Sequence, residues 1–307
     1  MSLLRGLRWE LHVSNFCFFH YNWRIFIYTP WLPPTLHFQC IYLAYRWVLA
    51  IYSFIYFILI IYYVREYTLV YFTSWSQYLF TFYQLWSSIS VTVHHMKLGI
   101  PYCKKKCNSE KRKVVSSTDL PSKPTGCWCG LKYNVLKWHE CIHWISFFLA
   151  GEATSGLIFL YWVFIYNPKK GIDHWEISTH LLNGLLSWIN VWITQIPFRA
   201  HHVIYTIIYS ATYCTFTGFY YAAGGGNIQN NDRYIYSILD YGNYPVKATF
   251  FVLAAALIYA PLVHLFFYAN YLLREGLIHV LVKRGYCKWL LEKELGEENE
   301  MEPIIQE

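Results

Sequence analysis

Long apolar runs alternate along the chain with shorter polar connections. A helix needs about 20 mainly apolar residues to cross about 30 Å of hydrocarbon, and the chain contains six such runs. They span approximately residues 39–63, 67–94, 140–166, 175–196, 202–223 and 247–272. Because lipid offers the backbone no hydrogen-bond partners, runs of this length must be helical. The pattern therefore predicts an all-α fold, a polytopic membrane bundle of about six transmembrane helices.

Composition points to the same class of protein. Apolar residues make up 56% of the chain and charged residues only 14%, whereas roughly 25% of a soluble domain is charged. We divide the chain into a cytosolic or interfacial N-terminal segment (1–37), a six-helix transmembrane domain (38–275) with a basic cytosolic loop (97–137), and a cytosolic tail (276–307). The N-terminal segment mixes Trp and Phe with Arg, which is typical of segments that lie along a membrane interface.

Lysine and arginine are concentrated in the N-terminal segment, the basic loop, the short loop with Arg199 and the tail. Cytosolic loops carry an excess of these residues, so we expect both termini in the cytosol, with the protein in the plasma membrane or the endoplasmic reticulum. The net charge of +7 then reflects topology and requires no nucleic-acid partner. Arg46, inside the first run, is expected to extend toward the cytosolic interface.

The two longest connections differ in character. The basic loop contains Lys, Ser, Thr, Pro and Gly and is expected to be flexible, either as a topology determinant or as a surface that adheres to anionic lipid. The connection from Gly224 to Val246 is rich in tyrosine. An aromatic loop between two spans is expected to fold back over the bundle.

One motif suggests a metal site. His139, Glu140 and His143 form an H-E-x-x-H pattern, which on a helix places two imidazoles on one face with the glutamate as general base. The pattern, however, begins the third run at its cytosolic end, and no convincing third ligand motif follows. We therefore expect neither a metal nor another cofactor.

Two of the runs carry polar stripes, which appear when each residue is advanced by 100° around a helix. The stripe of the second run consists of Thr73, Ser76, Gln77, Gln84, Ser87, Ser88, His94 and His95. The stripe of the fourth run consists of Glu176, His180, Asn183, Ser187, Asn190 and Thr194. Polar groups at this depth are costly in contact with lipid, so both stripes should face protein. They either form interhelical hydrogen bonds or line one polar cavity.

Within these stripes, Thr73 and His180 each lie a few residues from the extracytosolic start of their runs. A rise of about 1.5 Å per residue places both roughly 8 Å below that surface. Glu176 lies one turn before His180, where its carboxylate can orient the imidazole. A hydroxyl, a base and an orienting acid are the groups that covalent acyl transfer needs. We therefore predict Thr73 as nucleophile, His180 as base and Glu176 as the orienting residue, with Ser76, Gln77 or Asn183 as oxyanion donor.

Several stretches resemble the rolling stone family of animal membrane proteins. They are Trp9–Ser14, Tyr45–Trp47, Tyr71–Trp75, His180–Asn183, Ile196–Arg199 and Tyr234–Asp240. The resemblance covers most of the chain except the basic loop and the tail, and it implies a role in cell contact or in cell fusion of the myoblast type. The family is more distantly similar to the androgen-induced hydrolases of fatty-acid esters of hydroxy fatty acids, whose catalytic residues are a threonine and a histidine.

That second resemblance implies the same pair of residues as the stripes. Thr73 follows Tyr71 and Phe72 as the hydrolases' threonine follows a similar pair, and His180 matches their histidine. The hydrolases carry an acidic residue ten positions after this histidine, where the present chain has Asn190.

Two functions follow from these observations. The first is a Thr73/His180 lipid-ester hydrolase, with membrane lipids as surroundings and a lipid ester as substrate. The second is a non-catalytic membrane protein that acts in cell contact or fusion through a cell-surface partner. A channel or transporter is a weaker third hypothesis, because no run is clearly broken and no half is duplicated. Its best support is Glu152 in the third run, which we expect to pair with an arginine or a histidine inside the bundle.

Overall fold

The computed structural model describes residues 23–33, 36–107, 136–166, 168–227 and 232–286, and helices dominate these ranges. Four of the predicted runs form uninterrupted or nearly uninterrupted helices: α2 (Leu36–Val64), α3 (Phe72–Cys107), α4 (Trp138–Phe164) and α7 (Val203–Ala222). The other two contain a π-helical turn. One comprises α5 (His174–Ile177), the turn Ser178–Leu182 and α6 (Asn183–Ile193); the other comprises α8 (Pro245–Ala254), the turn Ala255–Tyr259 and α9 (Ala260–Lys283).

The second run differs from its prediction at both ends. The prediction begins this run at residue 67, whereas α3 begins only at Phe72. Residues Arg65–Tyr67 before it form a 3₁₀ turn, in which Arg65 has a positive φ of 54°. The chain uses these residues to reverse direction. At the other end α3 continues to Cys107, so the predicted flexible loop is helical over its first part, because lysine is a good helix former. The rest of that loop, residues 108–135, lies outside the described residues.

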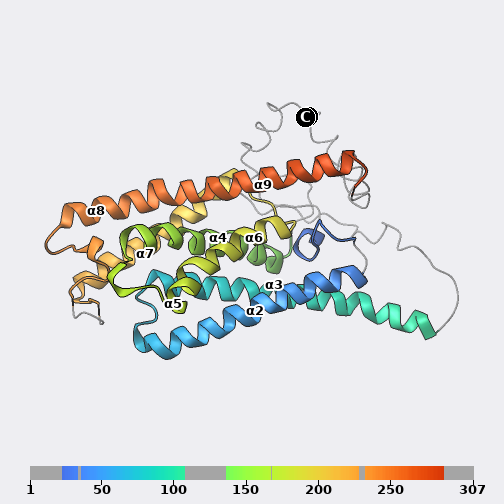
Figure 1. Cartoon of the computed structure of the whole chain (residues 1–307), viewed down its shortest axis with the longest axis horizontal. Helices are drawn as coiled ribbons and strands as arrows, with labels where there is room; N and C mark the ends of the chain where they lie inside the picture. The colour runs from blue at the N-terminus through green and yellow to red at the C-terminus, as the bar shows by residue number, and fades with distance from the viewer. Residues whose placement is uncertain (1–22, 34–35, 108–135, 167, 228–231, 287–307) are drawn as a thin grey trace.

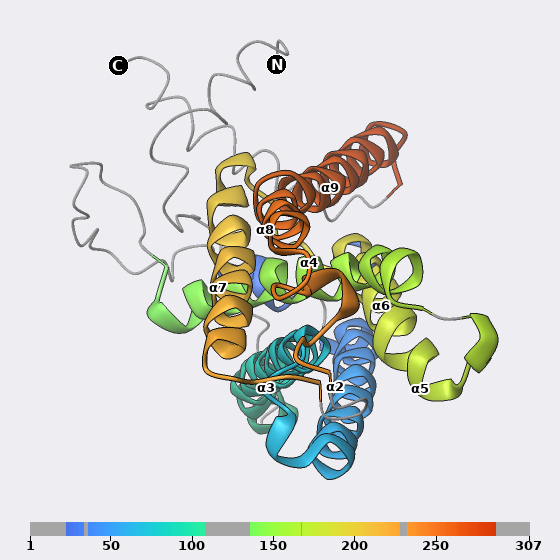
Figure 2. The same cartoon turned by 90° about the vertical axis from the view of Figure 1, so that its left-hand side faces the viewer.

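The long helices lie along one common axis, with α8 and α9 on one side of the bundle and α2 and α3 on the other (Figure 1). A view along that axis places α4 between these two sides (Figure 2). α4 contacts α3, α6, α7 and α9, and most of its first five turns are buried. It is therefore the central helix of the bundle.

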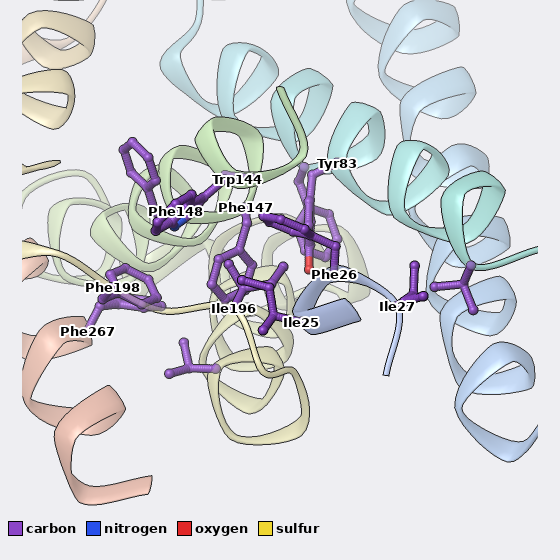
Figure 3. Packing of buried hydrophobic residues seen from close by; sticks show 14 of the residues in the cluster. Ile25, Phe26, Ile27, Tyr83, Trp144, Phe147, Phe148, Ile196, Phe198 and Phe267 are labelled. Carbon is purple, nitrogen blue, oxygen red and sulfur yellow. The ribbon is translucent and has the colours of Figure 1, made fainter. Parts of the chain in front are cut away.

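The largest hydrophobic cluster surrounds the first half of α4, where Trp144, Phe147 and Phe148 pack against side chains from α3, α9 and the connection after α6 (Figure 3). Ile25, Phe26 and Ile27 are buried in the same cluster. This part of the N-terminal segment therefore packs into the bundle, and the predicted interfacial position of the segment stays a prediction. Residues 1–22 lie outside the described residues.

The reason for this packing lies at the end of α6. A helix leaves its last carbonyl groups without intrahelical partners, and the hydroxyl of Thr29 donates to the Ile193 carbonyl at 2.6 Å. The indole N–H of Trp31 donates to the Trp192 carbonyl at 2.5 Å. The segment thus caps α6 while its apolar residues enter the core.

The outer surface of the described bundle is apolar. Three of its helices are long and apolar enough to cross a membrane, at His37–Tyr67, Trp138–Phe164 and Pro245–Lys283. Large side chains such as Val48 on α2 and Phe250 on α8 expose 65% and 71% of their surface. Apolar patches of this extent are rare on water-soluble monomers and suit contact with lipid. Most of the hydroxyl and amide groups of α3 and α6 face the interior of the bundle.

Candidate functional site

Both polar stripes face the interior of the bundle, as their helical periodicity predicts. None of the stripe residues is exposed, and most are buried. Many of them connect helices: Gln77 Nε2 donates to the Ser53 carbonyl of α2 at 3.0 Å, and Asn183 Nδ2 donates to Gln77 Oε1 at 2.6 Å. The hydroxyl groups of Thr154 and Ser187 lie 2.9 Å apart across α4 and α6. Interhelical hydrogen bonding is therefore one role of the stripes.

A different arrangement surrounds His180. Its ring stacks face to face on Tyr161 of α4, with centroids 3.6 Å apart and planes inclined by 4°. The Nδ1 atom of His180 is buried and has no hydrogen-bond partner. His180 lies in the π-helical turn Ser178–Leu182, and such turns occur frequently at functional sites. The imidazole is therefore held in a fixed plane with one nitrogen available.

Glu176 reaches the same group of side chains from the preceding turn. Its carboxylate lies beside the hydroxyl of Tyr161, and its Oε2 atom is buried without a hydrogen-bond partner. Its backbone N–H donates to Asp173 Oδ1 at 2.7 Å, which caps the short helix α5. The structure thus brings Glu176 and His180 together around Tyr161.

Thr73 lies in the first turn of α3, beneath the aromatic loop. As predicted, this loop folds back over the bundle, because Ile235 and Leu239 are buried. The hydroxyl of Tyr236 accepts a hydrogen bond from the Phe72 N–H at 3.1 Å and also interacts with Thr73. Burial raises the pKa of Tyr236 to about 12. Its hydroxyl therefore keeps its proton at physiological pH and remains a hydrogen-bond donor.

The structure places Thr73 and His180 at a similar depth without joining them. Thr73 is one turn before Gln77 on α3, His180 is one turn before Asn183, and the side chains of Gln77 and Asn183 are hydrogen-bonded. None of the hydrogen bonds of the described residues joins Thr73 to His180. Catalytic hydrogen bonds are often long before substrate binds, so this geometry leaves the pairing as a prediction.

The expected oxyanion donors are already engaged. Ser76 Oγ donates to the Phe72 carbonyl at 2.9 Å, and the amide groups of Gln77 and Asn183 take part in the contacts between α2, α3 and α6. Tyr236, which sequence reasoning did not nominate, is better placed beside Thr73. Its signal in the sequence was the tyrosine-rich loop, but nothing in the sequence indicated which tyrosine would reach α3.

An apolar groove, open to the surroundings, begins next to Thr73. Phe72 and three residues of the aromatic loop, Tyr236, Ile238 and Leu239, form part of its wall, while α4, α7, α8 and the residues that directly follow α4 and α8 supply the rest. Its lining residues on these helices are mainly apolar: Leu157, Leu160, Phe164, Ile165, Ser210, Tyr213, Cys214, Thr217, Phe251, Val252 and Ala255. A groove with this apolar lining suits a hydrocarbon chain.

Glu152 pairs with a histidine inside the bundle, as predicted. Its Oε1 atom is 2.8 Å from His264 Nδ1 on α9, and its Oε2 atom accepts a hydrogen bond from Thr206 on α7. His264 Nε2 lies 3.0 Å from the Arg199 carbonyl oxygen, so this nitrogen carries the hydrogen that joins them. Both partners are buried. Glu152, Thr206 and His264 thus connect three helices, and their side-chain polar atoms all have hydrogen-bond partners.

The prediction that Arg46 extends toward the cytosolic interface is wrong. The side chain is completely buried, and its Nη1 atom donates to Asn190 Oδ1 at 3.0 Å. The orientation of α2 about its own axis explains the difference. Arg46 is on the face of α2 that contacts α3 and α6, so protein surrounds its side chain.

The H-E-x-x-H motif forms the start of α4. Glu140 Oε2 accepts a hydrogen bond from the Lys137 N–H at 2.7 Å, which caps the helix, and His143 is buried beside the ring of Tyr83. In the part of the chain that the structure describes, no group of three or more His, Cys, Asp or Glu side chains is arranged to hold a metal ion.

The fold and its apolar surface indicate the class of this molecule, an all-α membrane protein. The chain is 25% identical over 239 residues to Protein rolling stone of Drosophila melanogaster, an alignment that covers 76% of this chain and 78% of that protein. The chain is therefore similar to a rolling stone protein over most of its length, as its sequence motifs predict. No family model and no solved structure matches the chain.

Proposed function

We propose that this rolling stone-like protein is a membrane-embedded hydrolase of long-chain lipid esters, with Thr73 as nucleophile and His180 as base. The observation that carries the proposal is the apolar groove, because two of its wall residues, Phe72 and Tyr236, are also the neighbours of Thr73. An acyl chain in this groove brings its ester carbonyl to the start of α3. His180, with an unpartnered buried nitrogen at a similar depth, supports the assignment of the base.

The reaction proceeds in two steps. Thr73 Oγ attacks the acyl carbonyl while His180 takes its proton, and the bond between the carbonyl carbon and the alkoxide oxygen breaks as His180 returns that proton to the leaving alcohol. Water then attacks the acyl-threonine with His180 again as base, which releases the fatty acid and restores the Thr73 hydroxyl. The Tyr236 hydroxyl donates to the carbonyl oxygen as negative charge develops. Glu176 orients the histidine through the group around Tyr161.

The proposed enzyme takes its substrate from the outer leaflet, which requires six crossings with both termini in the cytosol. An Asn-x-Thr site engineered near Asn227 is then expected to be glycosylated in a eukaryotic membrane, and one near Ser116 is not. A mobility shift removed by a glycosidase measures the modification. Glycosylation at Ser116 instead of Asn227 would invert the topology and rule out entry from the outer leaflet.

A large side chain placed in the groove tests whether the groove binds the acyl chain. Ala255→Trp, in the groove wall, is expected to lower kcat/KM for a long-chain ester by about tenfold, since excluding two methylene groups costs about 1.6 kcal/mol. Turnover of an acetyl ester should change little. Leu253→Trp on the same helix points outward, with 52% of the residue exposed, and serves as the matched control.

Purified wild-type protein in lipid vesicles provides the baseline for this test. Absence of ester turnover in the wild type contradicts the hydrolase and leaves the non-catalytic role in cell contact or fusion. Equal loss of activity toward both esters in Ala255→Trp contradicts the groove as the acyl-chain site.

A further inference from the structure

The centre of the bundle contains a buried cation with an incomplete set of partners. Arg46 Nη1 donates to Asn190 Oδ1 at 3.0 Å, and the same oxygen accepts the hydroxyl of Tyr45 at 2.9 Å. The guanidinium carbon lies 4.8 Å from the centre of the Tyr83 ring. No hydrogen bond of good geometry reaches Arg46 Nε or Nη2.

A second buried arginine shows how this protein satisfies such a group. Arg274 on α9 is also completely buried, and its guanidinium donates to the carbonyl groups of Val191, Thr194 and Ile196. It also forms a 2.7 Å ion pair with Glu275. Arg46 has neither of these features: among the described residues, no carboxylate pairs with it and no backbone carbonyl accepts from it.

Side chains around Arg46 also have buried polar atoms without hydrogen-bond partners. Four further buried polar atoms, on side chains that adjoin Arg46 directly or through Tyr83, have no hydrogen-bond partner: Asn190 Nδ2, the Tyr83 hydroxyl, the Ser87 hydroxyl and His143 Nε2. Asn190 touches Arg46 directly, and Tyr83 lies between Arg46 and His143, with its ring centre 5.8 Å from that of His143. The hydroxyl of Tyr83 is also close to the Arg46 guanidinium and to the hydroxyl of Ser87.

The unpartnered atoms have a common chemistry. The arginine and asparagine nitrogens can only donate, while the two hydroxyl groups and the imidazole can donate as well as accept. A buried charge without a counter-charge and several orphaned donors would each cost free energy. An acceptor that carries a single negative charge can take hydrogen bonds from several of these groups and offset the charge of Arg46.

We propose that the side chains of Arg46, Tyr83, Ser87 and Asn190 form a binding site for a small monovalent anion of chloride size, enclosed between α2, α3 and α6. Each of the unpartnered atoms is enclosed by protein, so a ligand with a long tail has no route to them. The single positive charge of Arg46 sets the charge of the anion at one. The site is separate from the residues assigned to ester hydrolysis.

The test is the thermal unfolding of the full chain in detergent, in sodium chloride and in sodium gluconate of equal concentration. Gluconate is too large for the enclosed site, so the comparison removes general effects of ionic strength. For the wild type, saturating chloride is expected to raise the unfolding midpoint by about 5 °C over gluconate. Bromide should act like chloride.

Two variants locate the effect. Asn190→Asp supplies an internal carboxylate next to Arg46, so the midpoint in gluconate should rise and the response to chloride should disappear. Arg46→Gln removes the charge and should also remove the response to chloride. Asn270→Asp is the matched control, because Asn270 is buried on α9 with other partners, Trp188 and the Phe266 carbonyl, and it should retain the response.

Each outcome bears on the proposal. If the wild type unfolds at the same midpoint in chloride and gluconate, water fills the site and the proposal is wrong. If Asn190→Asp keeps the full response, chloride binds elsewhere. Because Asn190→Asp is expected to stabilise the fold, the test does not depend on the stability of Arg46→Gln.

Discussion

Thr73→Ala is expected to abolish turnover of a long-chain ester and labelling by a serine-hydrolase-type activity probe. The substitution removes the only atom that can form the acyl-enzyme, while it leaves the first turn of α3 and the groove intact. His180→Ala should lower the rate by about 10²–10⁴-fold, because a hydroxyl of high pKa needs a base to become a nucleophile. Both variants should still insert into the membrane and fold.

Matched variants separate catalysis from packing. Thr73→Ser keeps a hydroxyl at the same position and should retain measurable labelling and turnover. Ser76→Ala removes a hydroxyl that donates to its own helix, at the Phe72 carbonyl, and should have a mild effect. Full activity in Thr73→Ala would exclude the enzyme hypothesis at this site, and the cell-contact hypothesis would then take its place.

Glu152→Ala is expected to reduce the free energy of unfolding by about 3–5 kcal/mol, because it leaves the buried His264 and Thr206 without their common partner. The group connects α4, α7 and α9, so the loss should affect the whole bundle. Thermal unfolding in detergent, followed by circular dichroism, measures the change. Glu152→Gln keeps hydrogen-bonding atoms on the side chain and should cost less.

A double variant tests the physical origin of this loss. Replacing both members of a buried pair by apolar residues of similar volume is often nearly neutral, so Glu152→Leu with His264→Leu should be more stable than either single variant. Additive losses in the double variant would contradict the pairing. Since the pair lies apart from Thr73, stable single variants should retain ester turnover.

Local periodicity was sufficient to predict the helices and their buried faces. Each of the six apolar runs is helical, and the stripes that include Gln77 and Asn183 face protein, because the polar face of a helix follows from the spacing of residues along it. An unpaired carboxylate inside the membrane costs much free energy, so the position of Glu152 in an apolar run was sufficient to predict that it has a buried partner. The aromatic character of residues 234–241 predicted that their loop covers the bundle.

Only the tertiary structure decided which groups meet. Spacing along one helix does not specify which neighbour it faces or how that neighbour is rotated, so the sequence did not identify His264 as the partner of Glu152. It also did not predict the stacking of His180 on Tyr161 or the contact of Tyr236 with α3. Arg46 shows the same limit most clearly. Its distance from the helix end permits a path to the interface, but the rotation of α2 in the bundle turns the side chain inward to Asn190.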